Sequence, residues 1–414
     1  MLKPSRLCLL VLCLALFTID AGAQGLPEAA PEDVGISSDR LARVDQLMEK
    51  HVDASQIAGA ISLVARNGKV VHFNAYGARN IATGEPMTTD TIVRIYSMSK
   101  PITSVALMML YEEGAFHLDD PVEKYIPAFK NQQVYVEGPA ANPVLRPVEN
   151  KMTIRHLLTH SSGLSYGIFS NTVVDSLYRK ETGRAWWPNL EKLATSMGSL
   201  PLLFEPGDRW YYSLATDVLG YLVEVLSGQP FDEFLHARIF DPLNMVDTGF
   251  FVPADKINRF AANHGIDNTG KLMVVDPPNG QFSQKPAFLS GGGGLVSTAS
   301  DYVRFAQMLL NGGELDGVRI LGRKTVEYMT VTHIDGVHAP GYGFGLGFSV
   351  RLEDKAPGVI GTPGTYGWNG AANTHYFADP EEQVIGIFMT QLMPYGRYPL
   401  LPNFRVALYQ SLVD

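Results

Sequence analysis

The hydrophobic positions near the start of the globular chain predict a helix followed by a hairpin. Ser37 offers an N-cap, and the residues that then recur at helical spacing are Leu41, Val44, Leu47 and Met48. Two β-rich runs follow, over 57–64 and 70–76, and they flank the dipeptide Asn67-Gly68. Because Asn-Gly favours a tight turn between antiparallel strands, we expect these two runs to pair.

A second helical pattern begins at Ser97 and ends at Gly114, and the character of the chain then changes. The stretch 116–283 carries short helical patterns, such as 153–159 and 217–226. Loops rich in Pro and Gly join them. Segment 130–150 is polar, so we expect it to be a long loop. This middle part of the chain therefore predicts a mainly α-helical insertion.

Strand-like patterns return in the last third of the chain, over 342–350, 373–379 and 384–391, and a closing helix is predicted over 404–413. The order of elements predicts an α/β (α+β) sheet domain, built from 24–115 and 284–414, that is interrupted by a helical domain over 116–283. No internal repeat or low-complexity segment is visible.

The first 23 residues have the features of a signal peptide. Lys3 and Arg6 precede the apolar run 7–17, and Ala21-Gly22-Ala23 fits the small-residue cleavage rule. The run is too short to span a bilayer comfortably. The alternative to a signal peptide is a buried N-terminal helix. We expect cleavage after Ala23, export to the periplasm or the medium, and no integral membrane segment afterwards.

Composition excludes several classes of protein. The chain has 414 residues, 46% of them hydrophobic and 18% charged, which is typical of a globular protein. Its net charge of −9 argues against a nucleic-acid-binding protein, which would need a basic face. Signal cleavage would remove both cysteines, Cys8 and Cys13, so disulfides, cysteine nucleophiles and thiolate metal sites are excluded from the mature chain.

One short motif carries candidate chemistry, the S-x-x-K formed by Ser97 and Lys100. At this spacing the two side chains share one face of the predicted helix, and burial of the lysine would favour the neutral form that can act as a base. The helix N-terminus also favours a developing negative charge. The alternative reading is a capping serine beside a surface lysine, because S-x-x-K alone is a weak pattern.

The S-x-x-K and four further segments resemble the serine β-lactamase and penicillin-binding-protein superfamily, most closely its class C-like branch with the family VIII carboxylesterases. These segments follow in the expected order and are Thr153–Leu164, Pro206-Gly207 with Tyr212-Ser213-Leu214, Ser290–Leu295, and Trp368-Asn369-Gly370. The resemblance covers roughly residues 33 to 414. It implies an antiparallel sheet flanked by helices, with the inserted helical domain described above.

The resemblance also implies roles for individual residues. Ser97 would be the acylated nucleophile, and Lys100 and Tyr212 would share the proton transfers. The backbone N–H groups of Ser97 and Ala371 would form the oxyanion hole, Ala371 because it follows Gly370. No metal or organic cofactor is implied.

The substrate-binding positions implied by the resemblance are Trp368, Asn369, Gly370 and Leu214. Two of them depart from the lactamase pattern. Trp368 stands where a cation or a histidine is expected, and Leu214 replaces an asparagine that would bond a substrate amide. Trp offers one N–H and an apolar face, and Leu can neither donate nor accept a hydrogen bond. Both changes disfavour carboxylated amides and favour neutral esters.

Two alternatives compete with residues of the proposed site. The segment 163–167 is a literal G-x-S-x-G centred on Ser165, but it follows a helical pattern instead of a strand, so we expect a loop serine there. Tyr211 is the alternative to Tyr212, and we expect it to be a core aromatic residue.

Other patterns have structural interpretations. His156 and His160 lack the glutamate of a zinc motif, so a structural pair is expected. The glycines at 291–294 lack the Lys-Ser/Thr of a phosphate loop and predict close backbone packing. Trp186-Trp187 could line an acyl pocket or pack in the core, and Lys324-Thr325-Val326 lies in a predicted helix without a role.

Three functions are consistent with these residues. The first is a secreted or periplasmic carboxylesterase that acts on a small-molecule ester through an acyl-enzyme. The second is an amidohydrolase, either a β-lactamase or a D-amino-acid peptidase. The third is a non-catalytic protein that binds cell-wall peptides, and the intact Ser97, Lys100 and Tyr212 argue against it, because binding alone needs none of them.

Overall fold

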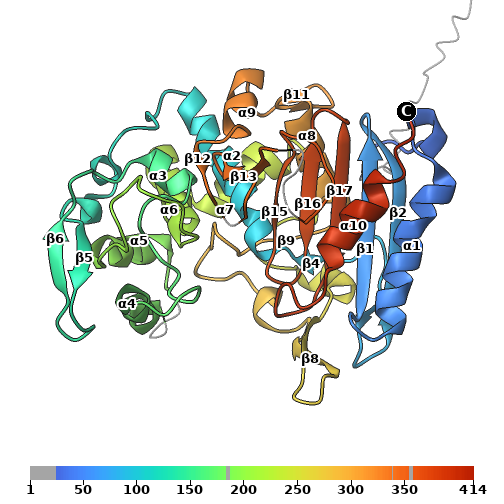
Figure 1. Cartoon of the computed structure of the whole chain (residues 1–414), viewed down its shortest axis with the longest axis horizontal. Coiled ribbons are helices and arrows are strands. Elements are labelled where there is room, and N and C mark those ends of the chain that lie inside the picture. Colours follow the sequence, from blue (N-terminus) through green and yellow to red (C-terminus); the bar gives the residue numbers. More distant parts are fainter. Residues whose placement is uncertain (1–24, 183–186, 338, 354–357) are drawn as a thin grey trace, which may run out of the picture.

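The computed structural model describes residues 25–182, 187–337, 339–353 and 358–414, and a nine-stranded sheet forms its centre (Figure 1). In order across the sheet, the strands are β12 (Ile334–Asp335), β13 (Tyr342–Phe344), β14 (Ser349–Arg351), β15 (Tyr366–Asn369), β16 (His375–Asp379), β17 (Val384–Thr390), β1 (Gly59–Arg66), β2 (Lys69–Asn80) and β3 (Glu85–Pro86). Every neighbouring pair is antiparallel, which confirms the expected sheet.

The hairpin β1–β2 forms around the dipeptide that predicted it. Asn67 and Gly68 have φ angles of 51° and 75°, the positive values that a type I′ turn needs, and Arg66 pairs with Lys69 across the turn. The early hairpin is therefore confirmed.

Helices cover both faces of the sheet and separate two hydrophobic cores. On one face lie α1 (Ser38–Asp53), capped by the Ser37 side chain, and α10 (Leu400–Tyr409) (Figure 1). On the other, α8 (Ala299–Leu310) packs against β1, β16 and β17. Strand β1 is buried along its whole length because its alternate residues serve the two cores: Ala60 and Val64 join α1 and α10, whereas Ile61 and Leu63 join the main core.

The helices of the middle segment gather beside the sheet, on the left of Figure 1. They are α3 (Ile154–Leu158), α4 (Val173–Thr182), α5 (Leu190–Ser199), α6 (Ala215–Ser227) and α7 (Phe231–Leu235). Helix α2 (Ser99–Glu112) packs against α6 and so connects the sheet part to this group. The structure confirms that the middle of the chain is mainly helical. The limits of this insertion at residues 116 and 283 stay a prediction.

The expectation of a long loop over 130–150 is wrong. The segment forms a hairpin of β5 (Gln133–Glu137) and β6 (Val144–Pro147), and Tyr135 N–H also donates to the carbonyl of Leu202. Of the strand residues only Val134 is buried, so the alternation of apolar and polar positions was too weak to indicate strands. A second hairpin in the middle segment, β7 (Asn263–Ile266) with β8 (Leu272–Asp276), projects at the bottom of Figure 1.

The single strand expected over 342–350 is also wrong, because the chain reverses inside it. Strands β13 and β14 are antiparallel neighbours, joined by a turn in which Gly345 N–H donates to the Phe348 carbonyl. Gly347 has φ 100°, and a Cβ there would lie 2.2 Å from Ser104 Oγ, so the turn requires glycine. Further short elements are β4 (Val93–Arg94), which pairs with β9 (Val296–Ser297), the pair β10 (Glu314–Leu315) and β11 (Val318–Arg319), and α9 (Arg323–Met329).

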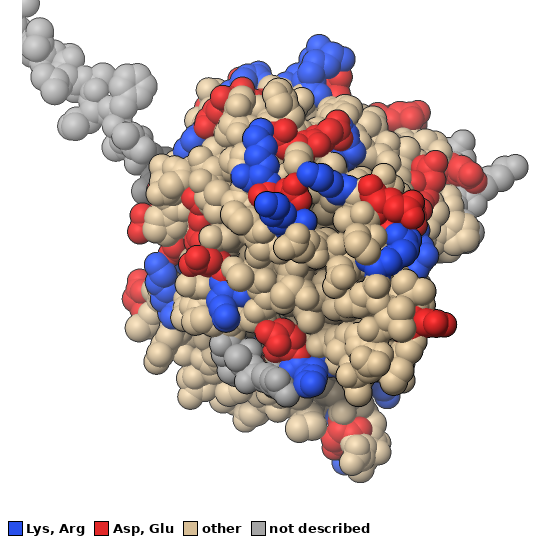
Figure 2. All heavy atoms as spheres, turned by 90° about the vertical axis from the view of Figure 1, so that its left-hand side faces the viewer, with Lys and Arg blue, Asp and Glu red and all other residues tan. Residues whose placement is uncertain are grey.

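The face formed by the middle segment carries charges of both signs. Figure 2 shows Lys and Arg interspersed with Asp and Glu around a broad area without charged side chains. Among the described residues no helix combines the length and apolar composition needed to cross a bilayer. The expected signal peptide, with both cysteines, lies outside the described residues, and export stays a prediction.

Candidate active site

Ser97 lies in a short 3₁₀ turn, Tyr96–Met98, that runs directly into α2. Tyr96 has φ 42°, a left-handed conformation that bulky residues rarely adopt. Ser99 stabilises this turn, because its hydroxyl donates to the Tyr96 carbonyl at 2.6 Å and accepts from the Leu295 N–H at 3.1 Å. The strained turn fixes the position of Ser97 between the sheet and the helix.

Lys100 is buried one turn further on, with 1% of its surface exposed. Its Nζ atom lies 3.3 Å from Ser97 Oγ, 3.0 Å from the Tyr166 hydroxyl oxygen and 2.6 Å from the carbonyl oxygen of Gly292. An ammonium can donate to all three. A neutral amine can instead accept from Ser97 and donate to the other two. The geometry therefore suits Lys100 in either protonation state.

Tyr212 lies directly beside Lys100. The Lys100 Nζ atom is 4.6 Å from the centre of the Tyr212 ring, and the indole N–H of Trp368 donates to the Tyr212 oxygen at 3.2 Å. The Trp210 ring stacks on Tyr212 at 6.0 Å, and His160 contacts it at 4.9 Å. Tyr212 is thus surrounded by aromatic rings, with the Lys100 nitrogen near its ring.

Tyr211, the alternative, points to a different group of residues. Its hydroxyl donates to Asp175 at 3.2 Å and lies 2.7 Å from Ser170 Oγ. The structure therefore brings Tyr212, and not Tyr211, to the S-x-x-K motif.

The G-x-S-x-G segment contributes its tyrosine instead of its serine. Ser165 is fully buried, donates to Asp175 Oδ1 at 2.6 Å and accepts from the Gly167 N–H. Tyr166 accepts from Lys100, and burial, followed by the neighbouring Tyr212 and Asp217, raises the pKa of its phenol well above the usual value. Sequence reasoning missed Tyr166 because no local pattern relates it to a lysine 66 positions away.

The glycine run 291–294 packs closely against the site, as expected. A Cβ on Gly291 would lie 2.8 Å from the Thr216 carbonyl, and one on Gly292 would lie 2.6 Å from Asp217 Oδ2. Asp217 is a second residue that the sequence did not single out for chemistry. It is 1% exposed and accepts the Gly292 N–H at 3.0 Å.

The turn that carries Ala371 lies against the segment before Ser97. A Cβ on Gly370 would meet the Ile95 carbonyl at 2.4 Å, and the Thr374 hydroxyl donates to the same carbonyl at 3.3 Å. Only glycine permits this approach of the two backbones. The pairing of Ser97 and Ala371 as oxyanion donors stays a prediction.

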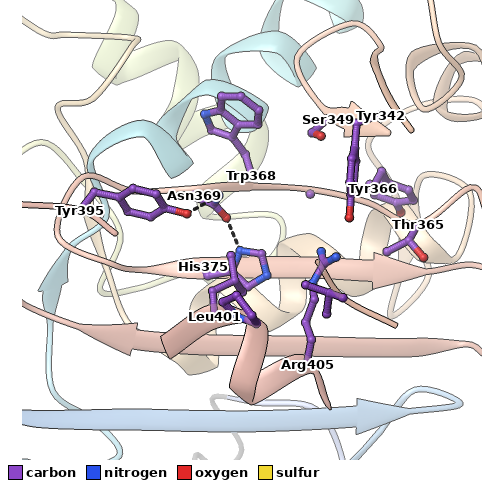
Figure 3. Close-up of a pocket in the computed structure, with 13 residues that line it drawn as sticks. Tyr342, Ser349, Thr365, Tyr366, Trp368, Asn369, His375, Tyr395, Leu401 and Arg405 are labelled. Carbon is purple, nitrogen blue, oxygen red and sulfur yellow. Dashed lines mark hydrogen bonds between the residues drawn. The ribbon is translucent and has the colours of Figure 1, made fainter. Parts of the chain in front are cut away.

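Trp368 and Asn369 point to opposite faces of β15, as successive residues of a strand do. Figure 3 shows the indole of Trp368 on one side and the Asn369 amide turned toward His375 and Tyr395. Burial lowers the pKa of the His375 imidazole well below its usual value. Asn369 therefore bonds to His375 and Tyr395 on the face of β15 opposite to Trp368. Of the two side chains, Trp368 is the one beside Tyr212.

Comparison with known proteins identifies this arrangement. The family model of β-lactamases matches residues 44–410. The chain belongs to the β-lactamase family. Esterase EstB of Burkholderia gladioli is 31% identical over 390 residues, which are 89% of this chain and 95% of EstB. An uncharacterized protein of Mycobacterium tuberculosis is 37% identical over 362 residues, which are 83% of this chain and 88% of that protein.

A solved structure agrees with the fold of this β-lactamase family member. EstCE1, described as a hydrolase with promiscuous acyltransferase activity, superposes with a TM-score of 0.76 at 29% identity and covers 90% of this chain and 99% of EstCE1. The family and these relatives identify the chain as a serine hydrolase.

The histidines of this β-lactamase family member have structural surroundings. His156 accepts the Thr153 N–H in a capping box at the start of α3. His160 is buried against Tyr212, and burial, with the charge of Lys100, lowers its pKa well below the usual value. Among the described residues no group of three or more His, Cys, Asp or Glu side chains could hold a metal ion.

The other residues that the sequence singled out lie in the hydrophobic core or on the surface. Leu214 is buried in the main core at the start of α6, and Trp187 belongs to the same core. Trp186 lies outside the described residues. Lys324 is exposed on α9, as its helical pattern predicted.

Proposed function

We propose that the protein is a carboxylesterase that cleaves esters through an acyl-enzyme on Ser97. The observation that carries this proposal is the 3.3 Å contact between Lys100 Nζ and Ser97 Oγ, with the Tyr212 ring 4.6 Å from the same nitrogen. A serine becomes nucleophilic when an adjacent base takes its proton, and this geometry supplies two candidates for that base.

The proposed reaction has two similar halves. In the first, the Ser97 proton moves to the phenolate of Tyr212 or to the neutral amine of Lys100, and Ser97 Oγ forms a bond to the ester carbonyl carbon, whose oxygen takes the negative charge. The backbone N–H groups of Ser97 and Ala371 hold the resulting oxyanion. The C–O bond to the alcohol then breaks, and the leaving oxygen takes up the stored proton. In the second half a water molecule attacks the acyl group in the same way and releases the acid.

The walls of the site support an ester over a carboxylated amide. The indole N–H of Trp368 is engaged by Tyr212, and its ring meets Phe344 edge-on at 5.2 Å. Phe169 is 56% exposed, and its ring lies 5.4 Å from the Tyr212 ring, which adds an apolar surface at the site. Aromatic faces bind apolar groups well and offer no charge to a carboxylate.

The relatives support the same conclusion, because EstB is an esterase and EstCE1 is a hydrolase with acyltransferase activity. A β-lactamase or D-amino-acid peptidase is the alternative within the family. It is less favoured, since the resemblance expects a cation and an asparagine to bind the carboxylate and the amide, and this chain has Trp368 and Leu214 at those positions.

The deciding experiment combines a substrate panel with covalent labelling. We expect p-nitrophenyl esters to be hydrolysed faster than nitrocefin or a D-alanyl peptide, and a fluorophosphonate to label Ser97. Faster turnover of nitrocefin would favour the lactamase alternative. Absence of a fluorophosphonate adduct on Ser97 would support a protein that only binds.

We further propose that the enzyme works outside the cytoplasm on a small-molecule ester. The proposal is supported by Lys3, Arg6 and the cleavage pattern ending at Ala23. N-terminal sequencing of the protein recovered from the periplasm or the medium should give Gln24 as the first residue. Recovery of the intact N-terminus in the cytoplasm would contradict export.

A further inference from the structure

A buried carboxylate lies next to Lys100 and has no part in the reaction described above. Asp217, on α6, is 1% exposed. Its Oδ1 atom accepts the Ser290 hydroxyl at 2.5 Å and the Gly292 N–H at 3.0 Å. Two donors on one oxygen favour the ionised form of a buried carboxyl group.

The Gly292 residue connects this carboxylate to Lys100. Its N–H donates to Asp217, and its carbonyl oxygen accepts from Lys100 Nζ at 2.6 Å. A Cβ on Gly292 would lie 2.6 Å from Asp217 Oδ2 and 3.0 Å from the Tyr166 oxygen. A glycine at this position is therefore what allows the carboxylate, the phenol and the ammonium nitrogen to converge.

The other titratable groups that face Lys100 are Tyr212, Tyr166 and His160. Burial, followed by the neighbouring Tyr212 and Asp217, raises the pKa of Tyr166, whereas burial and the Lys100 charge lower the pKa of His160, so both side chains are neutral near pH 7. Burial also raises the pKa of Asp217, and the charge of Lys100 and the hydrogen bonds from Ser290 and Gly292 oppose that rise. The Lys100 charge and these hydrogen bonds favour the ionised form that burial disfavours, and an ionised Asp217 supplies a counter-charge to a protonated Lys100.

We propose that Asp217 is a positioning residue that holds Lys100 in its protonated form beside Ser97, so that Tyr212 is the group that takes the serine proton. This proposal rests on the proposed function. In the step, Tyr212 reacts as the phenolate: the Ser97 O–H proton moves to its oxygen while Ser97 Oγ bonds to the carbonyl carbon, and the carbonyl electron pair moves onto the carbonyl oxygen. Lys100 keeps its proton, and the Tyr212 proton later passes to the leaving alkoxide.

The test is the pH dependence of kcat/KM for a p-nitrophenyl ester in wild type and Asp217→Asn. Asn keeps the shape of the side chain and removes its negative charge. Without that negative charge, the Lys100 ammonium and the Tyr212 phenol each lose a proton more readily. Both the acid limb and the alkaline limb of the profile should therefore move to lower pH by about one unit. A purely structural role would lower the profile without moving its limbs, and that result would overturn the proposal.

Asp301→Asn is the matched control. Asp301 is also a fully buried aspartate whose Oδ2 accepts two hydrogen bonds, from the Asp247 N–H and the Thr248 hydroxyl, and it lies on α8. Its replacement should leave both limbs where they are in wild type. Movement of the limbs in this control to the same extent would show that loss of any buried carboxylate shifts the profile, and would overturn the specific role of Asp217.

A second variant covers the case in which Asp217→Asn does not fold. Ser290→Ala removes one donor from the carboxylate and makes ionisation of Asp217 less favourable, so the limbs should move in the same direction by a smaller amount. Unmoved limbs in Ser290→Ala would contradict the proposal. Fluorophosphonate labelling of wild type distinguishes the proposed function from the role of Asp217. A wild type that is not labelled contradicts the proposed function. A wild type that is labelled, with unmoved limbs in the variants, contradicts only the role of Asp217.

Discussion

The indole N–H of Trp368 donates a hydrogen bond to the phenol oxygen of Tyr212 over 3.2 Å, although the two residues are 156 positions apart. Trp368 stands where a cation is expected in lactamases, so the sequence alone indicates an effect on substrate choice. The contact adds a second effect. A donor directed at the Tyr212 oxygen stabilises that oxygen most when it carries negative charge, which favours Tyr212 as the group that accepts the Ser97 proton.

Trp368→Phe should therefore reduce turnover more than binding. It keeps an aromatic ring beside Tyr212 and removes the donor. A hydrogen bond to a charged group contributes about 1.5–3 kcal/mol, so kcat for a short p-nitrophenyl ester should fall by about 10-fold or more while KM changes little.

Trp210→Phe is the control for this prediction. The Trp210 ring stacks on Tyr212 at 6.0 Å with an angle of 13° between the planes, so its replacement tests packing on the same phenol. Its effect on kcat should be clearly smaller. Equal losses in the two variants would mean that packing, and not the hydrogen bond to Tyr212, explains the effect of Trp368.

Lys100→Met and Tyr212→Phe should each lower kcat by about 100-fold or more, the scale of general acid–base catalysis. The two groups would serve one proton transfer, with Tyr212 as the acceptor and Lys100 as the charge beside it, so the double variant should be little slower than either single variant. The measurement is a double-mutant cycle on ester hydrolysis. Losses that multiply would show that the two residues act in separate steps.

Ser165→Ala should keep activity and lose stability, whereas Ser97→Ala should lose activity. The Ser165 hydroxyl is one of several donors to the buried carboxylate of Asp175, and loss of a hydrogen bond to a charged group costs about 1.5–3 kcal/mol. Denaturant unfolding should detect that loss, and the ester assay should show turnover within about threefold of wild type. An inactive Ser165→Ala beside an active Ser97→Ala would contradict the proposed nucleophile.

The sequence predicted those parts of the fold that depend on local patterns. The turn at Asn67-Gly68 and the Ser37 cap of α1 are set by neighbouring residues, and both are found in the structure. The β5–β6 hairpin was missed because only Val134 is buried among its strand residues, which left little periodicity to detect. The reversal at Gly347 was missed because apolar residues continue on both sides of it.

In the candidate site, too, only the contacts between residues close in sequence could be predicted. Ser97 and Lys100 lie one helical turn apart, so their proximity could be expected from spacing alone. Tyr166 reaches Lys100 only through packing of the middle segment against α2, and Asp217 is connected to Lys100 only through Gly292. Such contacts depend on tertiary structure, and no motif of one chain segment contains them.

Asp301→Asn should gain stability relative to wild type as the pH rises. Burial of Asp301 on α8 raises the pKa of its carboxyl to about 6, against the opposing hydrogen bonds from Thr248 and the Asp247 N–H. A raised folded-state pKa means that stability is fully present below about pH 4 and is lost as the pH rises through 6. Over that interval wild type should lose up to about 3 kcal/mol that the asparagine variant keeps.

The measurement for Asp301 is the difference in unfolding free energy between variant and wild type at pH 4 and pH 8. Asp267→Asn is the control, because Asp267 is exposed and the Lys271 N–H, with Thr269, lowers the pKa of its carboxyl. Its difference should change in the opposite direction. A difference for Asp301→Asn that stays constant from pH 4 to pH 8 would mean that Asp301 ionises without cost in the folded protein.

Trp368→Lys should change substrate choice and retain more activity than Trp368→Phe. A lysine at this position can still donate toward the Tyr212 oxygen and adds a cation where a substrate carboxylate would bind. We expect the ratio of kcat/KM for nitrocefin to that for a short p-nitrophenyl ester to rise about tenfold, the low end of the value of a charge-assisted bond, because the surrounding aromatic residues remain. The ratio cancels losses that affect both substrates equally. An unchanged ratio, or a wild type that already prefers nitrocefin, would show that Trp368 does not set the selectivity and acts on Tyr212 alone.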